Sequence, residues 1–209
     1  MKTTAFILVM CFAAAAAAAQ QPAVPLGGGR TYVPLSPRYS RYYFSFSGGA
    51  SMPVGGHWGD GAVGFRASPS FALSGAKKVD ETLSYGVETS YSFGHKNEDI
   101  GAMLLRMFSL TPFLRVAYPA GNRTYYGILG AGIYHWTQPS FNVGAADYSS
   151  DSRSSLGINM GGGAIFPLRN SWKIGAELRW HHILNMKGDN FDVDIANNLA
   201  PSILLLHGF

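Results

Sequence analysis

Few side chains in this sequence of 209 residues have the types and spacing that perform chemistry. Asp189, Asn190, Asp192 and Asp194 offer clustered oxygen atoms of the kind that bind Ca²⁺ or Mg²⁺, but they lack the spacing of an EF-hand and are expected to form a solvated loop. The glycine run 161–163 is followed by no strand-to-helix transition, so it does not predict a phosphate-binding loop. We expect no metal, no cofactor and no catalytic residue.

A second group of charged residues lies at alternate positions of segments in which apolar and polar side chains alternate. Glu177 and Arg179 are two residues apart, which places both on one face of a strand. In an enclosed interior such charges must pair, because an unpaired buried charge is strongly unfavourable. We predict a polar network inside the protein formed by Arg66, Glu88, Arg115, Lys173, Glu177 and Arg179.

The elements that would position this network are β-strands. The alternation is clearest in 82–93 and 172–184, and the side-chain period of two predicts one apolar and one polar face. Six further segments follow the same pattern: 42–52, 63–74, 104–118, 124–136, 155–166 and 199–209. An even number of strands returns both ends to one side, as single-chain outer-membrane barrels require. The expected fold is all-β, an eight-stranded antiparallel transmembrane β-barrel.

The connections between these segments alternate in length, as in outer-membrane barrels. Short turns are expected at 75–81, 119–123 and 167–171, and mostly longer loops at 53–61, 94–101, 137–154 and 185–197. Aromatic residues gather at the expected strand ends, where amphipathic rings suit a membrane interface. The interface residues predicted in this way are Phe93, Trp136 and Trp180 at the loop end, and Tyr118, Tyr125, Phe166 and Trp172 at the turn end, where Phe209 also lies.

The N-terminal segment resembles an export signal. Lys2 precedes the apolar stretch 5–12, and the alanine run 13–19 offers cleavage sites, so we expect a signal peptide over 1–19 that is cleaved near Ala19. The Pro- and Gly-rich segment 20–40 is expected to be a periplasmic lead, and 41–209 the barrel. Cys11, the only cysteine, falls in the signal, so the mature chain can form no disulfide.

Composition narrows the class of protein. Only 13% of the residues are charged, against about 25% in an ordinary soluble protein. The mean hydropathy of +0.06 is too polar for a helical membrane protein. The pI near 9.2 could suggest nucleic acid, but the basic residues are dispersed and the chain is exported, so no nucleic-acid partner is expected.

These features together resemble the small OmpA/OmpX-like outer-membrane β-barrel domains of Gram-negative bacteria. The resemblance rests on the signal peptide, the eight segments, the spacing of Tyr125, Gly127, Gly130 and Gly132, and the terminal Gly208-Phe209. It implies contact with outer-membrane lipid and lipopolysaccharide. It also implies that the barrel-assembly machinery reads the last strand through Ile203, Leu205 and Phe209. His207 departs from the apolar pattern. Pro69 and Pro112 fall within expected strands, so they should lie at bulges or the strand boundaries are wrong.

Several functional alternatives follow from the same pattern. A lipocalin-like soluble barrel would turn the apolar face inward around a ligand. The interior charges could form a structural plug or a gated ion path, although eight strands leave room only for side chains. The run 179–185 is similar to the His-x-Ser-Asn motif of outer-membrane lipid A deacylases, with His182 and Asn185 in place, but Leu184 replaces the nucleophilic serine. We expect a non-enzymatic structural or surface-interaction protein that binds any surface ligand through loops 137–154 and 185–197.

Overall fold

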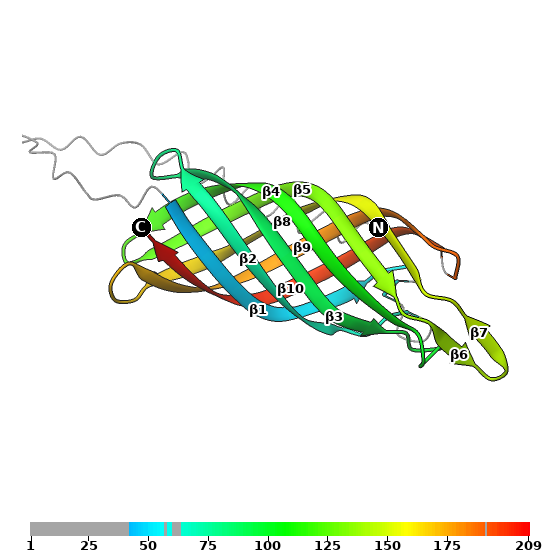
Figure 1. Cartoon of the computed structure of the whole chain (residues 1–209). Helices are drawn as coiled ribbons and strands as arrows, with labels where there is room; N and C mark the ends of the chain where they lie inside the picture. The colour runs from blue at the N-terminus through cyan, green and yellow to red at the C-terminus, as the bar shows by residue number, and fades with distance from the viewer. Residues whose placement is uncertain (1–41, 57, 60–63, 191) are drawn as a thin grey trace, which may run out of the picture. The chain divides into compact units, whose positions relative to one another are not determined.

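The strands of the protein close on themselves to form one barrel. The computed structural model describes residues 42–209 except for 57, 60–63 and 191, so the expected signal peptide 1–19, the lead 20–40 and the boundary at 41 lie outside the described residues. The strand order around the barrel is β1-β10-β9-β8-β5-β4-β3-β2, and every neighbouring pair is antiparallel (Figure 1). Within the same described residues, no helix is long and apolar enough to cross a membrane.

The eight barrel strands are long, and a small separate hairpin accompanies them. The barrel strands are β1 (Tyr42–Val54), β2 (Ser68–Lys78), β3 (Leu83–Lys96), β4 (Leu104–Ala120), β5 (Arg123–Gln138), β8 (Asp151–Pro167), β9 (Trp172–Lys187) and β10 (Asp192–Gly208). The hairpin pairs β6 (Phe141–Val143) with β7 (Ala146–Tyr148) and extends beyond one end of the barrel (Figure 1).

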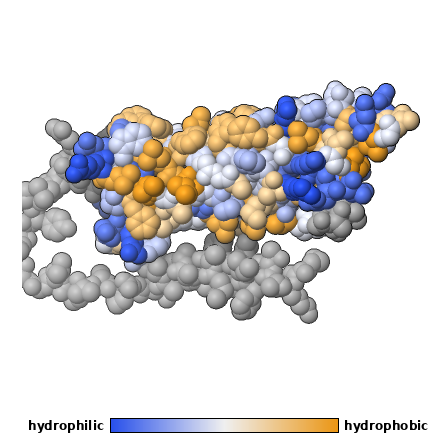
Figure 2. Space-filling model, turned by 90° about the horizontal axis from the view of Figure 1, so that it is seen from below, coloured by the Kyte–Doolittle hydropathy of each residue, from blue (hydrophilic) through white to orange (hydrophobic). Residues whose placement is uncertain are grey.

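Side chains alternate along each strand between an apolar outer wall and an inner face. In β4, Leu110 and Leu114 are 43% and 53% exposed, whereas Thr111 and Arg115 between and beside them are buried. Figure 2 shows apolar residues gathered along the middle of one face of the barrel, with hydrophilic residues at its two ends. A continuous exposed apolar wall of this kind is the surface that a hydrocarbon environment stabilises and water does not.

The two ends of the barrel differ. The first and last strands meet in a pair of backbone hydrogen bonds between Tyr42 and Phe209, with N···O distances of 3.2 and 2.9 Å. At this turn end the connections 79–82, 121–122 and 168–171 are short, whereas the opposite loop end carries 55–67, 97–103 and 139–150. Short periplasmic turns and longer extracellular loops are the rule in outer-membrane barrels, which orients the loop end outward.

Several expected boundaries were wrong. The second strand begins at Ser68 rather than at 63, and the expected loop 185–197 consists mostly of strand, because β9 continues to Lys187 and β10 begins at Asp192. Lys187 of β9 forms cross-strand ion pairs with Asp192 and Asp194 of β10, which helps these charged segments to pair as strands beyond the apolar wall. The loop 137–154 contains the β6–β7 hairpin between the extended ends of β5 and β8.

The strand prolines do not lie at bulges, and for Pro69 the alternative expectation, a wrong strand boundary, is confirmed. Pro112 keeps its register with Val87 of β3, while the β4–β5 pairing has no partners recorded at 111 and 112. Its missing N–H therefore falls where the ladder is already interrupted. Pro69 pairs with Ala50 at the start of β2, before the β2–β3 pairing begins. The recorded register shift lies in β3, between Ser92 and His95.

Candidate functional site: a filled barrel interior

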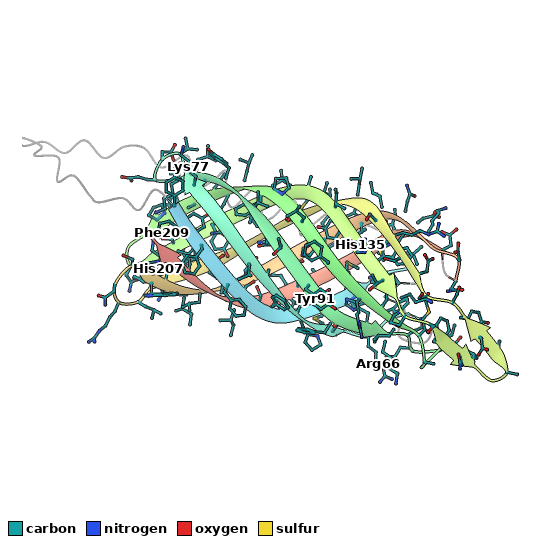
Figure 3. All side chains as sticks on the ribbon, in the orientation of Figure 1. Arg66, Lys77, Tyr91, His135, His207 and Phe209 are labelled. Carbon is teal, nitrogen blue, oxygen red and sulfur yellow. The ribbon has the colours of Figure 1, made fainter. Side chains whose placement is uncertain are left out.

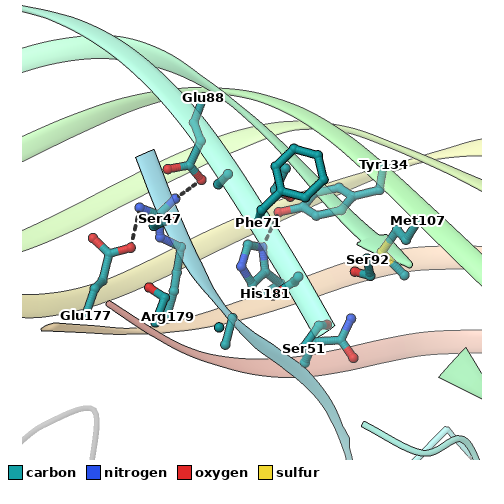
Figure 4. A pocket seen from close by; sticks show the side chains of 17 residues that line it. Ser47, Ser51, Phe71, Glu88, Ser92, Met107, Tyr134, Glu177, Arg179 and His181 are labelled. Atoms are coloured by element: carbon teal, nitrogen blue, oxygen red, sulfur yellow. Dashed lines mark hydrogen bonds and ion pairs between the residues drawn. The ribbon is translucent and has the colours of Figure 1, made fainter. Parts of the chain in front are cut away.

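The centre of the barrel holds a compact group of buried charges. Arg179 of β9 forms ion pairs with Glu88 of β3 and, at 2.7 Å, with Glu177 of its own strand (Figure 4). Arg115 of β4 lies 3.9 Å from Glu177. All four side chains are less than 9% exposed. Two acids and two bases make a neutral set, so each buried charge has a partner of opposite sign.

A tyrosine completes this charge network. The Tyr126 hydroxyl donates a 2.7 Å hydrogen bond to Glu177, and the Arg115 guanidinium lies 4.5 Å from the centroid of the Tyr126 ring. The same guanidinium lies 5.3 Å from the ring centroid of Tyr43. Arg115 is thus held by aromatic faces beside a carboxylate, and Arg179 by two carboxylates, which fixes both bases in place rather than leaving them mobile in an open channel.

Next to the charges lies a small polar cavity of about 50 Å³. His181 accepts or donates a 2.9 Å hydrogen bond with the Tyr134 hydroxyl, which also accepts a hydrogen bond of 3.3 Å from Asn159. The cavity lining contains serines of several strands, among them Ser47, Ser90 and Ser202. Its volume is sufficient for only one or two water molecules, so it offers no room for a larger ligand.

Apolar layers lie toward both ends of the interior. The cluster toward the loop end consists of buried side chains from several strands and from the segment after β1: Trp58, Phe65, Met103, Leu105, Met107, Tyr134, Trp136, Phe141, Ile183, Met186 and Ala196. The cluster toward the turn end consists of Tyr43, Ala76, Phe113, Tyr126, Ile128, Ile165, Leu204 and Leu206. The charges are therefore enclosed between two apolar layers, and the barrel interior is a packed core rather than an aqueous bore.

Glycines of β8 make room for the large rings in this interior. A Cβ atom added at Gly157 would lie 2.7 Å from the Tyr134 ring, and one added at Gly163 would lie 2.7 Å from the Tyr126 hydroxyl. A larger residue at either position would push a ring out of place. These glycines are required because tyrosine rings of the adjacent strand β5 and the backbone carbonyls of His182 and Ala176 in β9 approach them closely.

The structure brings together four of the six residues of the expected interior network and separates the other two from them. Glu88, Arg115, Glu177 and Arg179 form the central group described above. Lys173 shares their face of β9 at the turn end, opposite the buried Leu206, and is half-buried. The expectation for Arg66 was wrong, because this residue precedes β2 in a loop and points away from the barrel (Figure 3).

Arg66 instead pairs with Glu98 at the loop end. Its Nε and one terminal nitrogen donate hydrogen bonds of 2.6 and 2.5 Å to the two carboxylate oxygens. The bidentate hydrogen bond and the charge of Arg66 hold the pKa of the Glu98 carboxyl below its usual range. In the turn between β2 and β3, backbone N–H donation from Leu83 and Thr82 lowers the pKa of Asp80 in the same direction.

Most of the expected interface aromatics lie on the outer wall, but one does not. Phe93, Tyr118, Tyr125 and Phe166 are exposed, and Trp172 and Trp180 are half-buried. Trp136 is fully buried in the apolar layer at the loop end, so its assignment to the interface was wrong. Its position in β5 has the same parity as Tyr134, and alternation therefore directs it inward.

The last strand presents its expected assembly residues outward. Ile203 and Phe209 are 66% and 65% exposed, and Leu205 is exposed as well. His207, which interrupts this apolar series, packs its ring 4.6 Å from that of Trp172, in the aromatic cluster at the turn end (Figure 3). Position 207, which is apolar in the expected pattern, can hold an imidazole because aromatic neighbours surround the ring.

Sequence reasoning missed polar side chains on the outer wall near the loop end. His135 of β5 forms hydrogen bonds through both ring nitrogens, at 3.0 Å to Ser154 and at 3.1 Å to Ser152 of β8. The alternation of β5 could have revealed that His135 faces outward, but the serines lay in the expected loop. His182 also faces outward and forms a 2.8 Å hydrogen bond with Asn197, and its motif neighbour Leu184 is exposed.

Among the described residues, no group of three or more His, Cys, Asp or Glu side chains could hold a metal ion.

A family model described as "Outer membrane protein beta-barrel domain" matches residues 4–196. No curated protein sequence matches the chain.

Two of the solved structures that are similar to this chain illustrate the shared fold. Neisserial surface protein A (NspA) is 15% identical with a TM-score of 0.58, and the match covers 81% of this chain and 98% of that one. The N-terminal β-barrel domain of OprF from Pseudomonas aeruginosa is 8% identical with a TM-score of 0.50, covering 82% of this chain and 100% of that one.

Proposed function

Because this chain belongs to the outer membrane protein β-barrel domain family, we propose that it is a closed, non-catalytic barrel that presents its β6–β7 hairpin as a surface-interaction module. The family and the fold confirm the resemblance to small OmpA/OmpX-like barrels and place the protein in the bacterial outer membrane. The apolar outer wall faces lipid, which excludes the lipocalin-like alternative.

The projecting hairpin is the observation that carries the proposal. Phe141 and Tyr148 stack across it with ring centroids 4.7 Å apart and an interplanar angle of 3°, which orders its base. Beyond this stack, Asn142, Val143 and Asp147 are exposed. A rigid scaffold that holds an ordered loop with both polar and apolar exposed residues is a common arrangement for recognition.

The filled interior supports a role without transport. The neutral group of Arg179, Glu88, Glu177 and Arg115 acts as a structural plug, and the apolar layers on both sides raise the cost of moving an ion along the axis. In planar bilayers we expect no stepwise single-channel conductance from the purified protein. Regular conductance steps that disappear in an Arg179→Gln variant would favour the ion-path alternative.

The outer wall supports a role without lipid A deacylation. His182 is engaged by Asn197, and the position that the deacylase motif reserves for a serine holds Leu184. Acyl transfer needs a hydroxyl activated by a neighbouring base, and leucine supplies none. Mass spectra of lipid A from cells with and without the protein should be identical, and loss of one acyl chain only in expressing cells would contradict the proposal.

The interaction role is tested by replacing 139–150 with a short Gly/Ser turn, which leaves β5 and β8 intact. Assembly is measured by heat-modifiable migration of the protein on gels. Binding is measured as retention of whole expressing bacteria on immobilised matrix glycoproteins and glycosaminoglycans, and as self-aggregation. We expect assembly to persist and binding to fall. Unchanged retention and aggregation would contradict the interaction role and would favour a purely structural role for the barrel.

A further inference from the structure

The outer wall carries a polar, positively charged patch at the loop end of β3, β4, β5 and β8. We name it the rim patch and define it as Lys96, Arg106, His135, Ser152 and Ser154. We propose that the rim patch binds the phosphorylated headgroup of an outer-leaflet lipid, namely a lipid A phosphate. The proposal rests on the membrane-spanning barrel and not on the partner of the β6–β7 hairpin.

Strand register places these residues in adjoining rows. Arg106 pairs with Thr137, which pairs with Ser152, and in the next row Phe108 pairs with His135, which pairs with Ser154. Residues directly opposite each other on one face lie within contact distance of neighbouring side chains. The two rows therefore bring one guanidinium, one imidazole and two hydroxyls together on three adjacent strands.

Lys96 adds a second cation beside them. It pairs with Leu104 of β4, which lies two residues from Arg106 on the same face, so the two cations are diagonal neighbours. Lys96 also contributes to the lowered pKa of the Glu98 carboxyl, so part of its charge is compensated at the loop end.

The height of the rim patch matches a lipid headgroup. The next row toward the turn end is wholly apolar and exposed, with Leu110 at 43%, Ile133 at 49% and Leu156 at 67%. The patch therefore begins where the hydrocarbon-facing wall ends. A ligand that lies there must be polar at the patch and apolar directly beneath it, as a lipid with several acyl chains is.

The charge of Arg106, at the centre of the rim patch, is not matched by an ion pair. Other cations at the loop end are paired: Arg66 with Glu98, Arg153 with Asp151 and Asp189, and Lys187 with Asp192 and Asp194. Arg106 is exposed and forms no ion pair with any of the residues that the structure describes. Strands β4 and β5 contain no Asp or Glu.

The chemistry of the patch selects a phosphate. A guanidinium binds phosphate oxygens through two parallel N–H donors, and a lysine adds a point charge. Both ring nitrogens of His135 form hydrogen bonds with Ser152 and Ser154, so the imidazole holds the two hydroxyls in place. The hydroxyl that accepts a hydrogen bond from the ring N–H keeps its own proton as a further donor. We expect the phosphate to lie over Arg106 and the acyl chains to lie along the apolar row beneath.

The test measures lipid binding to the folded protein in detergent micelles by native mass spectrometry, without divalent cations. The probes are lipid A carrying two phosphates and the same lipid A after enzymatic removal of both phosphates. We expect the phosphorylated form to bind the wild-type protein about tenfold more tightly. Equal binding of the two lipids would overturn the proposal, because only the phosphate distinguishes them.

Variants locate the site. Arg106→Gln should lower the affinity for phosphorylated lipid A to that for the dephosphorylated form, and Arg106→Lys should lower it by only a few fold. Arg123→Gln is the matched control, because Arg123 lies at the turn end of β5, with its guanidinium 5.5 Å from the centroid of the Phe166 ring. Equal losses in the Gln variants at both ends would overturn the assignment to the rim patch.

Folding and the hairpin are controlled separately. Heat-modifiable migration establishes that each variant is folded, and Arg106→Lys keeps the test usable if Arg106→Gln does not assemble. The variant with 139–150 replaced should still bind phosphorylated lipid A as the wild-type protein does. Loss of lipid binding in that variant would overturn the rim-patch assignment, whereas loss of surface binding alone concerns only the proposed hairpin function.

Discussion

Removal of Arg179 should destabilise the barrel more than removal of any exposed arginine. Arg179 is 3% exposed and pairs with both Glu88 and Glu177, so Arg179→Gln leaves two buried carboxylates that share only Arg115, which lies 3.9 Å from Glu177. Breaking a buried ion pair by removing one partner costs about 3 kcal/mol or more. We expect the free energy of unfolding in lipid vesicles, measured by urea titration of tryptophan fluorescence, to fall by about 3 kcal/mol.

Two further variants separate the effect of charge imbalance from the loss of contacts. The double variant Glu88→Gln with Arg179→Gln restores neutrality, and we expect it to recover about 1–2 kcal/mol relative to the sum of the single variants. Arg153→Gln is the matched control, because Arg153 also pairs with two carboxylates, Asp151 and Asp189, but its side chain is 46% exposed.

The control should change the free energy of unfolding by less than about 1 kcal/mol. A loss below about 1 kcal/mol for Arg179→Gln, or strict additivity in the double variant, would refute the reasoning that a balanced set of charges stabilises the interior.

Three other perturbations test the interior and the loop end. Trp136→Ala should lower the free energy of unfolding by about 3 kcal/mol, because it leaves a cavity in the apolar layer, and a loss near zero in urea titrations would contradict its interior position. Gly157→Val should cost about 1–3 kcal/mol through collision with a tyrosine ring, whereas Gly48→Val, where an added Cβ meets nothing within 4 Å, should be tolerated in the same assay. The pKa of Glu98 is lowered in the folded protein, so its pairing with Arg66 contributes stability above the ordinary carboxyl pKa and loses it as the pH falls through the lowered value. An NMR titration of the Glu98 carboxyl should therefore show a midpoint below that of an unperturbed glutamate, and Arg66→Gln should return it to the ordinary range.

The outer wall could be predicted from the sequence because a side chain that faces lipid needs only to be apolar. Leu178 lies between Glu177 and Arg179, and the structure exposes it on the wall. The inner face follows a different requirement. It must fill a fixed volume across the barrel, and the pairing of Arg179 with Glu88 joins strands 91 positions apart in the sequence. No local pattern encodes which charges meet at that separation.

The errors at the loop end have a common physical cause. Charged and small residues predict a loop because they are not apolar. Strands β9 and β10 nevertheless continue past the apolar wall, where a strand needs paired backbone groups but no apolar face. Trp136 was placed at the interface because aromatic rings favour it, although its parity in β5 directs it inward. Packing of a large ring against Tyr134 and its neighbours in the interior outweighs that preference.

The seam between β1 and β10 constrains how the protein is made. The two strands that close the cylinder come from opposite ends of the described chain, and Tyr42 and Phe209 lie side by side only when both have arrived. Until then β1 and β9 each present an open hydrogen-bonding edge, which hydrocarbon does not tolerate and which invites pairing between copies. Insertion and closure must therefore be nearly simultaneous, and the chain must be kept unfolded and unaggregated across the periplasm until its final strand is delivered.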